Sequence, residues 1–128
     1  MVPVVSKTLV SGKPLAAAIP KDTLEKIVKR TCDRGAEIVS LLGTGSAYYS
    51  PSAAVFAMVS AILNDTKTVM TASAHLSGEY GLKDIFIGVP CRIGHSGIEE
   101  IVELELSNAE LAALTNSAQA IKKTNVML

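Results

Sequence analysis

The pattern of hydrophobic and polar positions divides the chain into a helical first half and a β-rich second half. Residues 2–15 are rich in β-forming side chains and carry a turn signal at residues 11–12, so we expect extended chain there. Residues 21–34 place apolar side chains at the three- and four-residue spacing of one helix face. Gly35 is expected to end or kink this helix, and residues 36–42 form a second, short helical stretch.

A third helix is predicted within the longest uncharged part of the chain. Ser50 can cap a helix and Pro51 fits a first helical turn, so we expect a helix over residues 53–63 that residues 64–65 close. It belongs to residues 38–63, a run of 26 residues without a charge whose length alone would suit a membrane span. Glycines and the proline interrupt that run, so we predict a buried helix–turn–helix instead. Its apolar surface would be covered by something else, which includes a partner outside this chain, and a small membrane-associated protein is the alternative.

Three strands are predicted in the second half. Residues 68–74, 85–93 and 98–106 combine β-forming side chains with alternation of polar and apolar positions. A polar, glycine-containing connection over residues 75–84 and a tight turn at residues 94–97 separate them. We therefore expect an antiparallel meander.

The last predicted element is a helix that begins with a capping box. The Ser107 oxygen can accept a hydrogen bond from the backbone N–H of Glu110, whose side chain can reach back to Ser107. Four apolar residues then follow at helical spacing: Leu111, Leu114, Ala118 and Ile121. The order of elements predicts an α+β fold with helices packed on an antiparallel sheet.

Composition narrows the class of protein. The 128 residues suit one domain, and 12 basic against 12 acidic residues give no net charge, so no nucleic-acid partner is expected. The mean hydropathy of +0.36 is high for a soluble monomer. Cys32 and Cys91 do not make a disulfide framework; they suit a reducing compartment, the cytoplasm, in which a free cysteine behaves as a small buried hydrophobe.

One glycine-containing segment suggests a nucleotide-binding loop. Gly43 and Gly45 form a Gly-x-Gly pattern, but Tyr48 stands where the third glycine of a dinucleotide loop would be, and no Walker lysine follows. We therefore interpret the segment as a glycine-loosened connection between two helices.

The histidines and carboxylates do not form a convincing active site. His75 and His95 are both predicted in turns, without a cysteine or histidine at zinc-binding spacing. His95 is interpreted as a solvent-facing residue, since a general base needs a positioned partner. Four carboxylates lie on or near the third predicted strand. Their alternation with apolar residues is typical of the solvent-exposed face of a sheet and favours this interpretation over a metal site or a catalytic acid–base pair. These are Glu99, Glu100, Glu103 and Glu105. No catalytic residue and no metal ligand is predicted from residue chemistry.

Six segments, in order along the chain, resemble the malate/lactate dehydrogenase family. They are MVPV at residues 1–4, VSGKPL at residues 10–15, RGAEIV at residues 34–39, GSAYYSPSA at residues 45–53, GEYG at residues 78–81 and GVP at residues 88–90. Together they cover essentially the whole chain, and they are most similar to bacterial malate dehydrogenases that resemble lactate dehydrogenases. The resemblance implies that residues 1–128 are a partial substrate (C-terminal) domain that lacks the Rossmann domain.

The resemblance also implies a chemistry, which is hydride transfer between NAD and a 2-hydroxy acid. In the family a histidine holds the hydroxyl proton and an arginine binds the substrate carboxylate. That histidine immediately precedes the segment similar to residues 1–4, while its aspartate partner, the arginines and the glycine-rich NAD loop lie further upstream. By resemblance Ser46 and Ala47 face the substrate, and Pro51 packs near the nicotinamide ring. We therefore expect the isolated chain to be inactive.

Two functional alternatives follow. Ala47 is small and leaves room for a C4 dicarboxylate, which favours malate over lactate. A protein of another class would be a non-catalytic interaction module that self-associates through the face normally packed against the NAD domain. The expected partners are a small 2-hydroxy or 2-oxo acid in the complete enzyme, further copies in a homo-oligomer and a complementing N-terminal NAD domain.

Overall fold

The computed structural model describes residues 1–125, which fall into two compact units. Among the described residues, the first unit comprises residues 1–47 and 106–117, and the second comprises residues 48–105 and 118–125. In these residues no helix is both long and apolar enough to cross a membrane.

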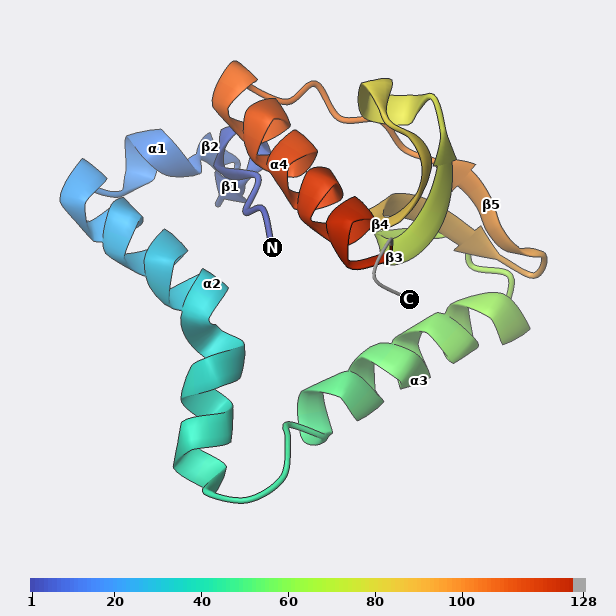
Figure 1. Cartoon of the computed structure of the whole chain (residues 1–128), viewed down its shortest axis with the longest axis horizontal. Coiled ribbons are helices and arrows are strands. Elements are labelled where there is room, and N and C mark those ends of the chain that lie inside the picture. Colours follow the sequence, from blue (N-terminus) through green and yellow to red (C-terminus); the bar gives the residue numbers. More distant parts are fainter. Residues whose placement is uncertain (126–128) are drawn as a thin grey trace. The chain divides into compact units, whose positions relative to one another are not determined.

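The first unit begins with short elements (Figure 1). They are the 3-10 helix η1 (Val5–Lys7), the paired strands β1 (Leu9–Val10) and β2 (Lys13–Pro14), and the helix α1 (Leu15–Ala18). The expected turn is confirmed, because Ser11 and Gly12 have φ angles of 50° and 78° between the two strands. The expectation of extended chain over residues 2–15 is wrong at η1 and at Leu15, the first residue of α1; this helix forms where a leucine and three alanines, all good helix formers, follow Pro14.

Helix α2 (Lys21–Leu42) is continuous, so of the expected end or kink at Gly35 the end, with a separate helix over residues 36–42, is wrong. Arg30 and Arg34 on one side of the glycine each lie 2.9 Å from Oε1 of Glu37 on the other side, and these ion pairs join the two halves. Hydrogen bonds from Arg30 and then Arg34 lower the pKa of Glu37 to about 2. The ribbon of α2 bends along its length in Figure 1. The helix ends where Gly43 takes a φ of 73° and its N–H bonds the Val39 carbonyl.

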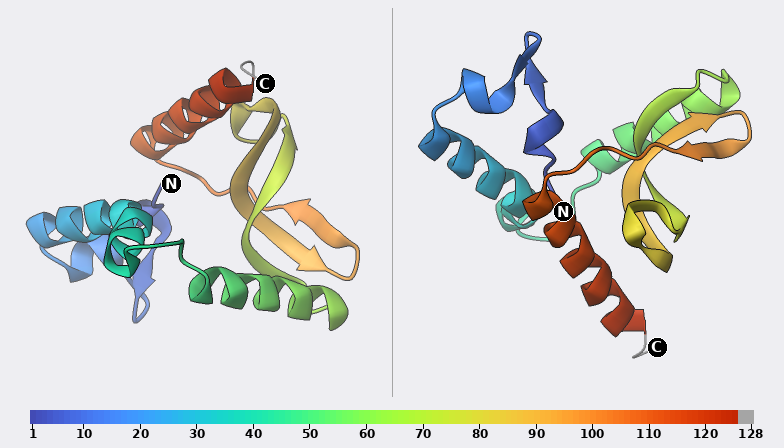
Figure 2. Two further views of the ribbon diagram at one scale, coloured as in Figure 1. Left: turned by 60° about the horizontal axis from the view of Figure 1, so that its bottom comes forward. Right: turned by 90° about the horizontal axis from the view of Figure 1, so that it is seen from above.

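The second unit contains helix α3 and a three-stranded sheet. Helix α3 (Tyr49–Leu63) is followed by β3 (Thr68–Ser77), the 3-10 helix η2 (Glu79–Gly81), β4 (Lys83–Gly94) and β5 (Gly97–Ile101). The strands are antiparallel in the order β3–β4–β5, so the predicted meander is confirmed. Figure 2 shows β3 and β4 as long, twisted ribbons, while β5 pairs only with the last part of β4.

The core of this unit lies on one face of the sheet. Alternate residues of β4 are buried, and α3 packs against this strand with Ala61 buried. The buried hydrophobic residues of the two long strands are Ala74, Leu76, Ile85, Ile87, Val89, Cys91 and Ile93. The period-two burial is the consequence of strand geometry, in which successive side chains point to opposite faces.

Three predicted boundaries in this unit are wrong. Strand β3 continues to Ser77, so His75 lies in a strand opposite Phe86 and not in a turn. Strand β5 stops at Ile101 and not at residue 106; beyond it the Val102 N–H donates to the Pro90 carbonyl at 2.8 Å, and the Val102 carbonyl accepts a hydrogen bond from the Tyr80 hydroxyl at 3.0 Å. Helix α3 begins at Tyr49 without a side-chain cap, so Ser50 does not cap it.

Helix α4 (Asn108–Asn125) is divided between the two units. Its residues 108–117 belong to the first unit, and its residues from 118 belong to the second. The predicted capping box is confirmed: the Ser107 N–H donates to Glu110 Oε2 at 2.9 Å, and the Glu110 N–H donates to Ser107 Oγ at 3.4 Å. Leu114 and Ala118 of the predicted apolar stripe are buried.

Ser6 adds two further hydrogen bonds to the Glu110 carboxylate, from its N–H at 2.9 Å and its hydroxyl at 2.6 Å. Burial raises the pKa of Glu110, but the bonds from Ser6 and Ser107 outweigh it and lower the pKa to about 2.

We predict that Glu110→Gln destabilises the chain at pH 7 by about 1 kcal/mol, the usual cost of a lost cap. Because folding lowers the pKa of Glu110 from 4.5 to about 2, its ionised form stabilises the fold fully above about pH 4.5. That contribution is lost as the pH falls toward 2, so the gap between wild type and variant should shrink. Urea unfolding at pH 7 and pH 3 measures this difference in the free energy of unfolding between wild type and variant.

The matched control is Glu25→Gln on the exposed surface of α2, for which we expect a change within about 0.5 kcal/mol at both pH values. An equal gap at the two pH values for Glu110→Gln would contradict the assignment.

Candidate functional site

The connection of residues 43–48 carries the two residues expected to face a substrate. It joins α2 to α3 and has no regular secondary structure; Gly43 and Gly45 take φ angles of 73° and 83°. A dinucleotide loop connects a strand to a helix, whereas this loop connects two helices. The interpretation of the Gly-x-Gly pattern as a loosened helix connection is therefore confirmed, and the loop does not fit the phosphates of NAD.

Ser46 and Ala47 lie next to each other in this loop, in the first unit. Ser46 is exposed and Ala47 is half-buried. A hydroxyl and a methyl group are thus available to a ligand, one to hydrogen-bond it and the other to form a small apolar wall. Neither residue carries a charge or a group that could act as a base.

Pro51 lies in the first turn of α3, in the second unit, and is exposed. No side chain caps this helix end; the Ser52 N–H and hydroxyl both donate to the Tyr48 carbonyl, at 2.9 and 2.7 Å. An exposed pyrrolidine ring at the start of a helix offers an apolar contact to a planar ligand.

The rest of α3 is apolar on nearly all sides. Ala61 is its only buried residue, while Phe56 is 73% exposed and Leu63 is 79% exposed. The expected buried helix is therefore not buried by the residues that the structure describes. A helix that is hydrophobic all round is typical of a protein interior, so α3 presents surface suited to a partner.

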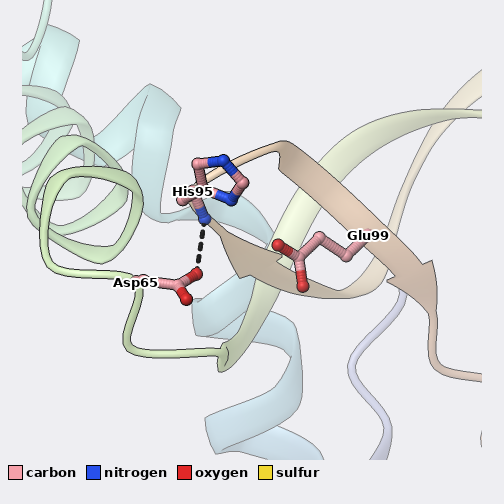
Figure 3. Close-up of side chains that lie close together, drawn as sticks. All are labelled: Asp65, His95 and Glu99. Atoms are coloured by element: carbon pink, nitrogen blue, oxygen red, sulfur yellow. Dashed lines mark hydrogen bonds between the residues drawn. The ribbon is translucent and has the colours of Figure 1, made fainter.

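A second group of polar side chains lies between the α3–β3 connection and the β4–β5 turn (Figure 3). Asp65, His95 and Glu99 each place one potential metal-ligand atom within 4.8 Å of the others. The His95 backbone N–H donates to Asp65 Oδ1 at 2.7 Å. The Lys67 ammonium lies among them, 2.9 Å from Asp65 Oδ1 and 2.6 Å from Glu99 Oε1.

The charges of this cluster stabilise one another. The hydrogen bond from Lys67 lowers the pKa of Asp65, assisted by the His95 N–H, and the bond from Lys67 also lowers the pKa of Glu99. In return the two carboxylates raise the pKa of Lys67. Oxygen and imidazole ligands suit a divalent cation, but here the Lys67 ammonium already lies between the two carboxylates and offsets one of their two charges.

Sequence patterns do not indicate this cluster, because Asp65 and His95 are 30 residues apart in the chain. The antiparallel pairing of Thr68 with Ile93 was the signal that could have located it, because it brings residue 65 beside the turn after Gly94. His95 is exposed, as predicted, with its ring Nδ1 at 3.2 Å from the Ser96 hydroxyl.

Of the two cysteines, Cys91 is buried, and burial raises the pKa of its thiol. Cys32 is exposed and is not the buried hydrophobic residue that was expected.

Comparison with known proteins identifies relatives over nearly the whole chain. Residues 1–126 match the family model of the lactate/malate dehydrogenase alpha/beta C-terminal domain. The malate dehydrogenase of Geobacillus kaustophilus is 49% identical over 128 residues, which are 100% of this chain and 41% of that protein. The malate dehydrogenase of Methanosarcina mazei is 47% identical over 96% of this chain and 40% of its own length.

Solved structures give the same result. The malate dehydrogenase of Salinibacter ruber superposes with a TM-score of 0.91 and 44% identity, covering 95% of this chain and 40% of that one. The lactate dehydrogenase of Cryptosporidium parvum, solved with lactic acid and nicotinamide adenine dinucleotide, superposes with a TM-score of 0.92 and 37% identity over the same shares. The chain thus spans about 40% of the length of the relatives that it matches. It belongs to the lactate/malate dehydrogenase family and corresponds to the alpha/beta C-terminal domain of those enzymes.

Proposed function

We propose that these residues are the substrate domain of an NAD-dependent malate dehydrogenase, which interconverts L-malate and oxaloacetate. The observation that carries the proposal is the 49% identity to a malate dehydrogenase along the whole chain. Lactate dehydrogenase is the alternative within the family, supported by the 37% identical lactate dehydrogenase of the same fold. Cytoplasmic location, a place in the tricarboxylic acid cycle and homo-oligomeric assembly are part of the same proposal.

In this proposal Ser46 and Ala47 line the substrate side of the active site, and Pro51 contacts the nicotinamide ring. The exposure of Ser46 and Pro51 and the partial exposure of Ala47 support these roles. The small Ala47 side chain leaves room for the second carboxylate of malate. NAD, when bound, accepts the hydride; the loop of residues 43–48 joins two helices and does not suit its phosphates, so its main binding site is proposed to lie in the N-terminal part of the enzyme.

The proton acceptor and the carboxylate-binding arginine are also proposed to come from that N-terminal part. The exposed surface of α3 supports such a partner, because an uncharged apolar helix is expected to be covered in the complete protein. The chain would thus supply one wall of a pocket and the interface that completes it.

We predict that the purified 128-residue chain does not oxidise NADH with oxaloacetate or pyruvate, because a wall without an acid–base group cannot move the hydroxyl proton. Loss of NADH absorbance at 340 nm measures it. The Geobacillus kaustophilus enzyme is the positive control, and sustained turnover by the chain would contradict the proposal.

We predict that Ala47→Leu lowers kcat/KM for oxaloacetate about tenfold in a chimera in which this chain replaces the aligned region of the Geobacillus kaustophilus enzyme. The larger side chain would occupy the space for the second carboxylate. The KM for NADH should change little, and steady-state kinetics measures both.

Ala16→Leu on the exposed surface of α1 is the matched control, for which we expect wild-type kinetics. Equal kinetics for the Ala47 and Ala16 variants would refute the substrate-facing role of Ala47.

A second candidate function, a self-associating interaction module, is favoured by the exposure of Phe56 and Leu63 on α3. It requires no catalysis. Without an N-terminal partner, a second copy of α3 is the occupant that would cover this surface.

We predict that the isolated chain scatters light as a species larger than its 13.4 kDa and that Phe56→Glu weakens the association roughly 10- to 100-fold, since it places a charge where a buried phenylalanine contributes about 1.5–3 kcal/mol. Phe86→Glu is the control, because Phe86 is also exposed, at 64%, but lies on the sheet. A clean monomer at high concentration, or equal weakening by both variants, would count against association through α3.

A further inference from the structure

Lys67 is the centre of an ionic network that joins two connections of the second unit. Its ammonium donates to both carboxylate oxygens of Glu99, at 2.6 and 2.7 Å, and lies 2.9 Å from Asp65 Oδ1. The same Asp65 oxygen accepts the His95 N–H from the β4–β5 turn. One cation therefore bridges a carboxylate of the α3–β3 connection and a carboxylate of β5.

The backbone of the α3–β3 connection is strained at the two residues of this network. Asp65 has a φ of 48° and Lys67 a φ of 54°, in the left-handed region that non-glycine residues rarely occupy. Aspartate tolerates this conformation, but lysine gains nothing from it by itself. A strained backbone persists only where its surroundings fix it, and the ammonium contacts are the evident cause at Lys67.

Gly94, on the β4 side of the network, leaves space for the carboxylates of Asp65 and Glu99. Gly94 precedes the β4–β5 turn and is buried. A Cβ at this position would collide with Glu99 Oε1 and lie 2.8 Å from Asp65 Oδ1. Gly94 is not among the residues with positive φ, so its lack of a side chain serves space and not backbone freedom.

Arg92 of β4 makes a second set of polar contacts beside the Lys67 network. The Arg92 Nε donates to Glu100 Oε2 at 2.7 Å, and its guanidinium also reaches the Lys67 carbonyl at 3.4 Å. Strand β4 thus holds the backbone of Lys67 while β5 holds its side chain.

We propose that Lys67 is the resident cation of an ionic latch, consisting of Asp65, Lys67, His95 and Glu99, that holds the α3–β3 connection in its left-handed conformation against the β4–β5 turn. The ammonium takes the place that a metal ion would need between the two carboxylates. The latch fixes where α3 ends relative to the sheet, and it is sensitive to salt because its members are exposed. It does not depend on the proposed enzymatic function.

The test is amide hydrogen exchange and backbone NMR on the 128-residue chain, with the His95 amide as reporter, because that N–H donates to Asp65. In Lys67→Met we expect the His95 amide to exchange roughly fivefold faster, the size of effect that an exposed charge network supports. The φ of residue 67 should leave the left-handed region, seen in its HN–Hα coupling and Cα shift. In wild type, 1 M KCl should accelerate exchange at His95, whereas Lys67→Met should no longer respond.

Lys83→Met is the matched control, since Lys83 is an exposed lysine of β4 outside the network, and it should behave as wild type. Glu99→Gln keeps the lysine and weakens the latch more mildly, so it provides a variant if Lys67→Met does not fold. Wild-type protection of His95 in both Lys67→Met and Glu99→Gln, or a residue 67 that keeps its positive φ without the ammonium, would overturn the proposal.

Discussion

The burial of one face of β4 is the constraint on which the second unit depends. Its alternate residues from Ile85 to Ile93 form most of the core, and the strand is paired with β3 along its length and with β5 at its end. A slip by one residue would turn this whole apolar set to the solvent, so the register is strongly fixed. That register decides which polar residues meet beyond the strand ends, and it brings the α3–β3 connection beside the β4–β5 turn.

The same principle explains what the chain leaves incomplete. Helix α3 packs against β4 with Ala61 buried, but large apolar side chains such as Phe56 and Leu63 are exposed among the residues described. Burying such a surface is favourable by about 25 cal/mol per Å² of apolar area, so exposure is costly unless a partner is present. The exposed apolar side chains of α3 are therefore suited to contact with a partner.

Much of the fold could be predicted from local patterns. The capping box of Ser107 and Glu110 and the antiparallel meander rest on short-range rules, and both are confirmed. Gly35 did not end its helix, in which ion pairs to Glu37 cross the glycine, and His75 lies in a strand, where it pairs with Phe86. The Lys67 cluster depends on pairing between distant segments, which periodicity alone does not specify. The roles of Ser46, Ala47 and Pro51 come from family resemblance and stay predictions.

The proposal that α3 packs against a further part of a longer dehydrogenase can be tested on the exposure of Phe56. Oxidative footprinting of Phe56 in the isolated chain at low concentration and in the chimera with the Geobacillus kaustophilus enzyme tests it most directly. The account predicts a reactive Phe56 in the isolated chain and strong protection in the chimera, with Phe86 as internal reference. Equal reactivity of Phe56 in the two proteins would contradict it.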